Sequence, residues 1–105
     1  MEEAIAVLRF RINGQKYKWE HLEAVKESDL VAKDSEEYTA HVLNALDKAN
    51  EALKNADSAQ ENILVAEIHS LIGSHYFRRI FPLARDDTKK QLEYLNKAKE
   101  SFKKL

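Results

Sequence analysis

The sequence predicts a mainly α fold, an antiparallel bundle of three long helices with a short helix and an N-terminal β-hairpin. Of the 105 residues, 44% are hydrophobic and 33% are charged, with only two Gly and one Pro, which argues against a many-turned β protein. Apolar residues recur at helical spacing through most of residues 34–105. The dipeptide Asn13-Gly14 is the strongest short hairpin signal. This length predicts a single domain over residues 1–105.

Residues 1–20 are predicted to form the hairpin, with the turn at Asn13-Gly14. Because side chains alternate along strands, one face would carry apolar and aromatic pairs and the other would carry cations. The apolar face pairs Phe10 with Tyr17 and Leu8 with Trp19, and the basic face pairs Arg11 with Lys16 and Arg9 with Lys18. For residues 4–12 a helix is the alternative, because Ile5, Leu8 and Ile12 also fit a helical face.

Residues 21–33 are predicted to form a short amphipathic helix and a linker. The bundle then occupies residues 34–105, and its first helix covers residues 35–56. Asp34 and Glu37 have the spacing of a capping box at its start. Its apolar seam is rich in alanine, which lets a neighbouring backbone approach closely; the seam consists of Tyr38, Val42, Ala45, Ala49, Ala52 and Ala56.

The second helix of the bundle is predicted at residues 59–81, and it is the most apolar segment of the chain. Ser58 and Glu61 repeat the capping-box spacing at its start, and Pro82 sets its end. Its apolar arc spans about two-thirds of the circumference at 100° per residue, so we expect neighbours on two sides. Gly73 costs about 1 kcal/mol in a helix interior, which predicts close packing or binding there.

The last helix is predicted at residues 87–104, capped by Asp86 or Asp87. Charge is unevenly distributed along the chain, which has a net charge of −1. Residues 20–77 are acidic, whereas residues 1–19 and 78–105 are basic. We expect this asymmetry to let antiparallel neighbours attract one another, with a basic surface for an anionic partner as the alternative.

Composition also excludes several classes of function. The chain has no Cys, so it holds no disulfide, thiolate nucleophile or Cys-based metal site, and we expect a cytoplasmic protein. The four His residues lack metal-binding spacing, and two glycines cannot form a phosphate loop, so we expect no metal and no cofactor. No apolar run approaches membrane-spanning length, so we expect no membrane partner.

The segment from Leu46 to Tyr76 resembles a junction between tetratricopeptide repeats. The resemblance is carried by small residues on one helix, a Leu-Gly-x-x-Tyr-like pattern on the next, and an Ala and a Phe on the last: Ala45, Ala49, Ala52, Ile72, Gly73, Tyr76, Ala98 and Phe102. This resemblance implies binding of a protein or peptide on a helical face, without catalysis. The leading interpretation is therefore a non-enzymatic interaction or scaffold module whose contact surface includes Gly73, Tyr76 and Arg79, or the edge of the hairpin.

Two alternative functions remain open. The run His69-Ser70-Leu71-Ile72-Gly73-Ser74 resembles the His-Ser-Leu-Lys-Gly-Ser motif of histidine phosphotransfer domains, with Ile72 in place of the Lys. That resemblance implies that His69 accepts a phosphoryl group. The other alternative is a nucleic-acid interface on the basic hairpin face, formed by Arg9, Arg11, Lys16 and Lys18. The partner's identity and the oligomeric state are not determined by the sequence.

Overall fold

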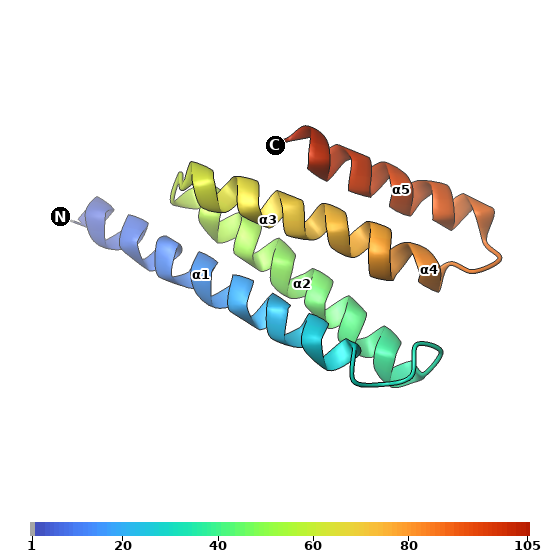
Figure 1. Cartoon of the computed structure of the whole chain (residues 1–105). Coiled ribbons are helices and arrows are strands. Elements are labelled where there is room, and N and C mark those ends of the chain that lie inside the picture. Colours follow the sequence, from blue (N-terminus) through green and yellow to red (C-terminus); the bar gives the residue numbers. More distant parts are fainter. Residues whose placement is uncertain (1) are drawn as a thin grey trace.

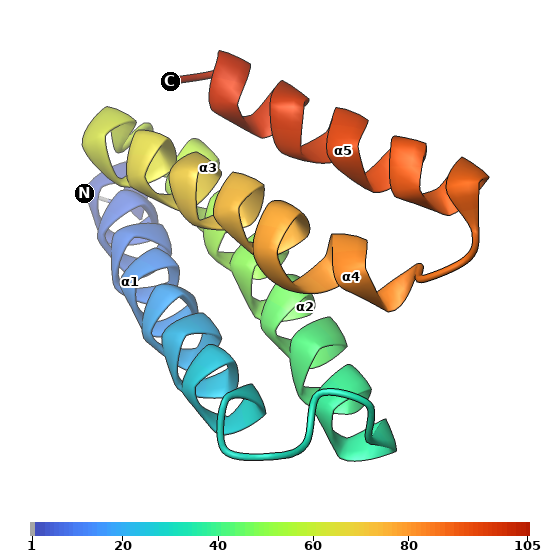
Figure 2. The same cartoon turned by 45° about the vertical axis from the view of Figure 1, so that its right-hand side comes forward.

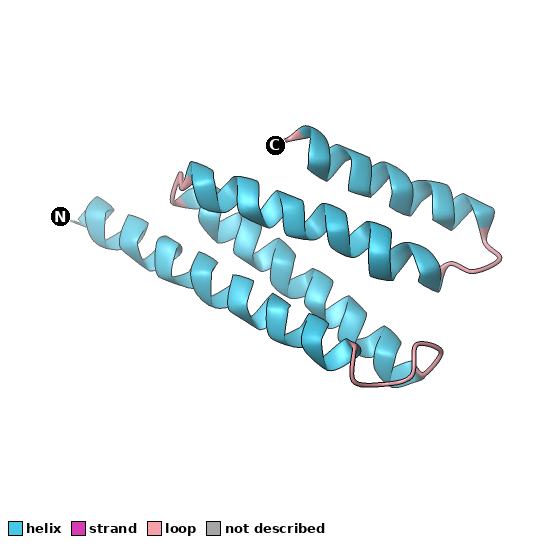
Figure 3. Cartoon of the chain, viewed as in Figure 1, coloured by secondary structure: helices cyan, strands magenta, loops and turns pink. Residues whose placement is uncertain are grey.

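The computed structural model describes residues 2–105, and within that range every regular element is helical (Figure 1, Figure 3). The elements follow in the order α1 (Glu2–Ser28), α2 (Glu36–Ser58), α3 (Asn62–His75), the π-helix η1 (Tyr76–Ile80), α4 (Phe81–Leu83) and α5 (Thr88–Lys103). The chain is therefore mainly α, as predicted.

The predicted β-hairpin is wrong, because residues 2–28 form one continuous helix with no strand in the described chain. Gly14 does not turn the chain but lies buried against α2 and α3. A Cβ placed on Gly14 would lie 3.1 Å from Leu64 Cδ2 and 3.4 Å from the backbone nitrogen of Ala56. The small residue thus allows two helices to approach closely. The separate short helix predicted within residues 21–33 is also wrong, because that segment is part of α1, which continues to Ser28. The predicted linker is present, since residues 29–35 lie between α1 and α2 outside any helix.

The three long helices predicted for the bundle are confirmed, with shifted caps. Ser35 rather than Asp34 caps α2, since its hydroxyl accepts a hydrogen bond from the Tyr38 backbone N–H. Asp87 caps α5 by accepting from the Lys90 N–H. The capping box predicted at Ser58 is not formed, because α3 begins only at Asn62 and Gln60 has a positive φ of 56°.

The helix predicted to end at Phe81 instead passes Pro82 through a widened turn. The Phe81 N–H donates to the carbonyl of Tyr76, five residues earlier, and the helix continues to Leu83. In a regular α-helix the ring of Pro82 would collide with the carbonyl four residues before it, at Arg78. The π-helix relieves that collision, so one proline accounts for the local geometry.

α1, α2 and α3 pack on one another, with α2 against both α1 and α3, and α5 lies on the other side of α3 (Figure 2). The predicted position of α3 between two neighbours is confirmed, because it packs against both α2 and α5. The alanine seam of α2 is buried, and α1 packs closely along α2 as expected. By contrast, α5 packs on α3, η1 and α4 and leaves α1 and α2 to form the opposite side of the molecule.

Candidate functional site

The predicted contact face around Gly73 and Tyr76 is an internal packing surface. Phe102 of α5 covers Gly73 so closely that a Cβ there would lie 2.9 Å from its ring. The rings of Tyr76 and Tyr94 pack with centroids 6.1 Å apart. The close packing predicted from Gly73 is therefore confirmed, and its partner is α5 of the same chain.

Arg79, the third residue predicted on that face, links η1 to the end of α1. Its Nη2 donates to Asp29 Oδ2 at 3.1 Å, and the two side chains form an ion pair. The Nε of Arg79 is buried without a hydrogen-bond partner in the described chain. Arg79 thus holds two elements together rather than facing an outside partner.

The four cations predicted on a hairpin face lie on α1, and two of them are engaged within the chain. Arg11 forms an ion pair with Glu61, and Lys18 Nζ lies 2.5 Å from Glu67 Oε1. Arg9 and Lys16 have no carboxylate partner within residues 2–105. The four cations predicted to form one basic patch are therefore of two kinds: Arg11 and Lys18 are neutralised within the chain, whereas Arg9 and Lys16 face solvent.

His69 is buried, with 7% of its surface exposed, and its Nδ1 has no partner in the described chain. Burial lowers the pKa of His69 from 6.5, and the nearby Lys104 lowers it further, while Asp57 opposes them. A phosphoryl acceptor must meet a bulky donor at its ring nitrogen. The burial of His69 therefore gives no support to the phosphotransfer alternative.

Two other histidines, which the sequence did not single out, pair in the centre of the molecule. The rings of His21 and His75 meet edge to face with centroids 5.2 Å apart, and both are buried. His21 Nδ1–H donates to the carbonyl of Ala45 at 2.7 Å, and His75 Nε2–H donates to that of Val42 at 2.8 Å. Both imidazoles thus tie their helices to the backbone of α2.

These histidines stay neutral near pH 7, because each has a lowered pKa. The pKa of His75 is lowered to about 4, chiefly by burial; its hydrogen bond to Val42 opposes the shift, whereas His21 and Arg79 add to it. Burial also lowers the pKa of His21, against its bond to Ala45. The pair is a buried, uncharged contact between α1 and the end of α3.

An apolar stripe lies on the outer face of α1, which we call the outer stripe; it consists of Ile5, Leu8, Ile12 and Trp19. Their exposed fractions are 55%, 52%, 58% and 62%. At 100° per residue they fall within an arc of about 60°, opposite the buried Gly14, His21 and Ser28. Their spacing of three, four and seven residues is that of a heptad seam. This spacing was visible in the sequence, but the hairpin prediction obscured it.

The first turns of α1 project past the turn between α2 and α3 (Figure 1). Gly14 lies opposite Ala56 near the end of α2, and Arg11 reaches Glu61 in the following turn. Residues 2–10 therefore extend beyond the end of α2, and we call this segment the overhang. Three of the four residues of the outer stripe lie on or next to this overhang.

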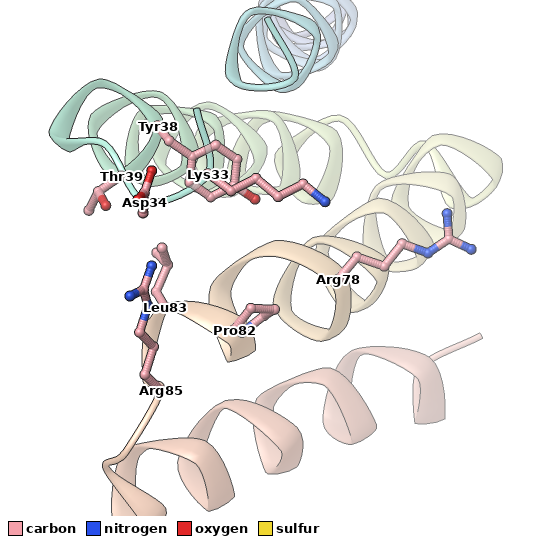
Figure 4. A pocket seen from close by; sticks show the side chains of 8 residues that line it. All are labelled: Lys33, Asp34, Tyr38, Thr39, Arg78, Pro82, Leu83 and Arg85. Carbon is pink, nitrogen blue, oxygen red and sulfur yellow. The ribbon is translucent and has the colours of Figure 1, made fainter. Parts of the chain in front are cut away.

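A polar pocket of about 400 Å³ lies between the start of α2 and the segment around α4 (Figure 4). We call it the α2–α4 pocket; its lining consists of Lys33, Asp34, Tyr38, Thr39, Arg78, Pro82, Leu83 and Arg85. In Figure 4, Lys33 extends along the α2 side of the space toward Arg78, whereas Arg85 rises from the other side beside Leu83; Arg78 directs its guanidinium away from the space. Burial raises the pKa of Tyr38, with opposing effects of Arg79, which lowers it, and Asp29, which raises it.

A shallow apolar groove of about 500 Å³ lies on the other side, where α5 meets η1. Its lining consists of Phe77, Leu95, Ala98, Lys99, Phe102 and Lys103. Phe102, which lines this groove, also packs on Gly73. The groove is therefore the exposed border of the contact between α3 and α5. Nothing in the structure indicates what would cover it.

The described part of the chain holds no group of three or more His, Asp or Glu side chains arranged to bind a metal ion. Within the same range, none of the helices has the length and apolarity needed to cross a bilayer. Comparison with protein-family models, curated proteins and solved structures found no match to this chain. The functional argument therefore depends on the geometry of the exposed surfaces.

Proposed function

We propose that the protein is a non-enzymatic interaction module that binds an amphipathic helix along the outer stripe of α1. The observation that carries this proposal is a heptad-spaced apolar seam exposed on the face opposite the core. The surface differs from the predicted Gly73 face, which α5 of the same chain already covers.

Burial of the outer stripe would be favourable. Complete burial of a large apolar side chain contributes about 1.5–3 kcal/mol, so each half-exposed residue of the stripe has roughly 1 kcal/mol still to gain. The overhang adds a second reason, because short helices without tertiary packing are marginal in water. A partner helix lying along residues 5–19 would supply that packing.

The charges beside the stripe favour a partner with acidic flanks. Arg9 and Lys16 occupy the same flank and have no carboxylate partner within the described residues. Arg11 and Lys18 occupy the other flank and are neutralised by Glu61 and Glu67 of the same chain. A partner helix that places Glu or Asp opposite Arg9 and Lys16 would complete the pattern.

The same charges disfavour a second copy as the occupant. In a parallel pairing of two α1 helices, Arg11 would lie next to Lys16 of the other copy. In the antiparallel register that pairs Leu8 with Ile12, Arg9 would approach its own counterpart. Like charges at these flanking positions weaken association, so the seam suits a partner of different sequence.

The test uses a designed three-heptad peptide with Leu at the a and d positions and Glu at the e and g positions. We expect isothermal titration to detect binding to the wild-type chain, and no binding of a peptide with Lys in place of Glu. The double variant Leu8→Glu/Ile12→Glu should abolish binding. The matched control is Ile63→Glu, because Ile63 on α3 is 86% exposed and outside the stripe.

Three results would overturn the proposal. Equal binding of the acidic and basic peptides would remove the argument from charge. Self-association of the wild-type chain in sedimentation, lost in the double variant, would make the second copy the occupant. Salt-sensitive binding of an oligonucleotide that is lost on reversal of Arg9 and Lys16 would instead favour the nucleic-acid alternative.

A further inference from the structure

The apolar surface of the overhang is wider than the outer stripe. Val7 and Phe10 have exposed fractions of 39% and 38%, and they lie outside the stripe, on the side of α1 that packs on α2 further along the helix. Together with the stripe they form an apolar arc of about 220° at 100° per residue; its members are Ala4, Ile5, Val7, Leu8, Phe10 and Ile12. A helix that packs on one neighbour needs an arc of about 100°. The overhang therefore has apolar surface for two neighbours.

The second side of this arc is a continuation of the seam between α1 and α2. Val7, Gly14 and His21 are spaced by seven residues, and Phe10 lies four residues before Gly14. Gly14 and His21 are buried against α2. Gly14 already lies opposite Ala56 near the end of α2, so no turn of α2 remains to cover Phe10 and Val7. The seam of α1 thus extends about two turns beyond the helix that covers the rest of it.

The shape and charge of the overhang favour a protein groove as its surroundings. A shallow groove of about 430 Å³ joins the two apolar sides; its lining consists of Glu3, Ala4, Val7, Leu8 and Arg11. Glu2, Ala6 and Arg9 form the exposed strip that would stay in water. Residues 2–10 have a net charge of −1, whereas helices that lie on anionic membranes have basic polar faces. The overhang therefore suits a groove between helices better than a lipid surface.

We infer that the partner holds the overhang between two helices, one along the outer stripe and a second along Val7 and Phe10. This inference rests on the proposed function, because the first of these is the helix proposed for the outer stripe. Two half-exposed side chains are too little surface to bind a separate helix, since association costs translational and rotational freedom, so both helices belong to one partner. The second helix continues the line of α2, antiparallel to α1 (Figure 1). Its N-terminus then faces the C-terminus of α2, which is the favourable arrangement of the two helix dipoles.

The test compares the single acidic three-heptad peptide with a tandem of two copies joined by a Gly/Ser linker of about twelve residues. Such a linker spans about 20 Å, which is about the distance between helices packed on opposite sides of α1. We expect isothermal titration of the full chain to show one tandem bound per chain, at least about tenfold more tightly than the single peptide. The variant Val7→Gln/Phe10→Gln should lose this gain and bind the single peptide as the wild type does. The matched control is Leu30→Gln/Leu43→Gln, which changes two exposed leucines outside α1 and should keep the gain.

A tandem that binds no more tightly than the single peptide would overturn this inference and leave the proposed function intact, whereas failure of both forms to bind would overturn the proposed function. Weaker binding of the single peptide to Val7→Gln/Phe10→Gln would also contradict the inference, because the change would then act on the outer stripe. Binding to vesicles of anionic lipid that is lost in the same variant would make a membrane surface the occupant instead. Thermal unfolding of each variant verifies that the fold is retained.

Discussion

The seam between α1 and α2 differs sharply from the seam between α3 and α5. The first is lined by small residues and closed by a hydrogen bond from the buried His21 to the backbone of α2. The second buries few side chains and leaves Phe77, Leu92 and Phe102 substantially exposed. The difference indicates that α1, α2 and α3 carry most of the stability, and that α5 is the least strongly attached helix.

Truncation of core side chains should reveal this difference most strongly. Ile68→Ala removes a fully buried side chain from the cluster between α2 and α3 and should cost about 3 kcal/mol of unfolding free energy. Leu95→Ala in the half-buried α3–α5 seam should cost about 1 kcal/mol. Urea denaturation measures both. Equal losses would mean that the α3–α5 seam contributes as much to the free energy of unfolding as the core between α2 and α3.

Acid should weaken the packing of α1 and α3 on α2 through the buried His21 and His75. The pKa of His75 is about 4 in the folded chain against 6.5 in the unfolded chain, so the unfolded state binds more protons between these values. Stability is therefore complete above pH 6.5 and falls as the pH drops toward 4, by about 3 kcal/mol for this group.

Urea denaturation from pH 7 to pH 4 measures this loss, compared with a His75→Gln variant that removes the titrating group. Its control is His41→Gln, which lies outside the buried pair and should retain the wild-type slope. A wild-type slope in His75→Gln would contradict the assignment. The lowered pKa of His21 adds to the effect in the same direction.

The two glycines give the smallest but most direct comparison. In Gly14→Ala the new Cβ meets Leu64 and the Ala56 backbone in a closed core, so we expect a loss of about 1 kcal/mol. In Gly73→Ala it meets only the ring end of Phe102, which is 41% exposed and free to rotate outward. Helix propensity then favours alanine by up to about 1 kcal/mol. Thermal unfolding distinguishes the two, and opposite signs are expected.

The sequence was a sufficient guide where local signals and tertiary packing agree. Helices α2, α3 and α5 follow from their apolar periodicity, and Asp87, one of the two aspartates predicted as the cap of α5, is that cap. Residues 1–20 were predicted wrongly as a hairpin for two reasons. Asn13-Gly14 is a local turn signal, and the Phe10–Tyr17 pair fits both the alternation of a strand and the 3.6-residue repeat of a helix. The spacing of Phe10, Gly14, Tyr17 and His21 is equally a helical face, and packing on α2 decided between them.

The candidate sites were less predictable for a different reason. The outer stripe lies within one helix and could be found from its heptad spacing once residues 2–28 were recognised as helical. The α2–α4 pocket combines Lys33 with Arg85, which are far apart in the chain. Only the route of the helix past Pro82 brings them to one space, and no spacing rule encodes that route.

The exposure of Trp19, the single tryptophan of the chain, tests the central claim most directly. We predict that acrylamide quenches its fluorescence fully in the chain alone, at every protein concentration. The acidic three-heptad peptide should shield it and shift its emission to shorter wavelength, and the basic peptide should not. A Trp19 that is already shielded in the chain alone, or unaffected by saturating acidic peptide, would contradict the account.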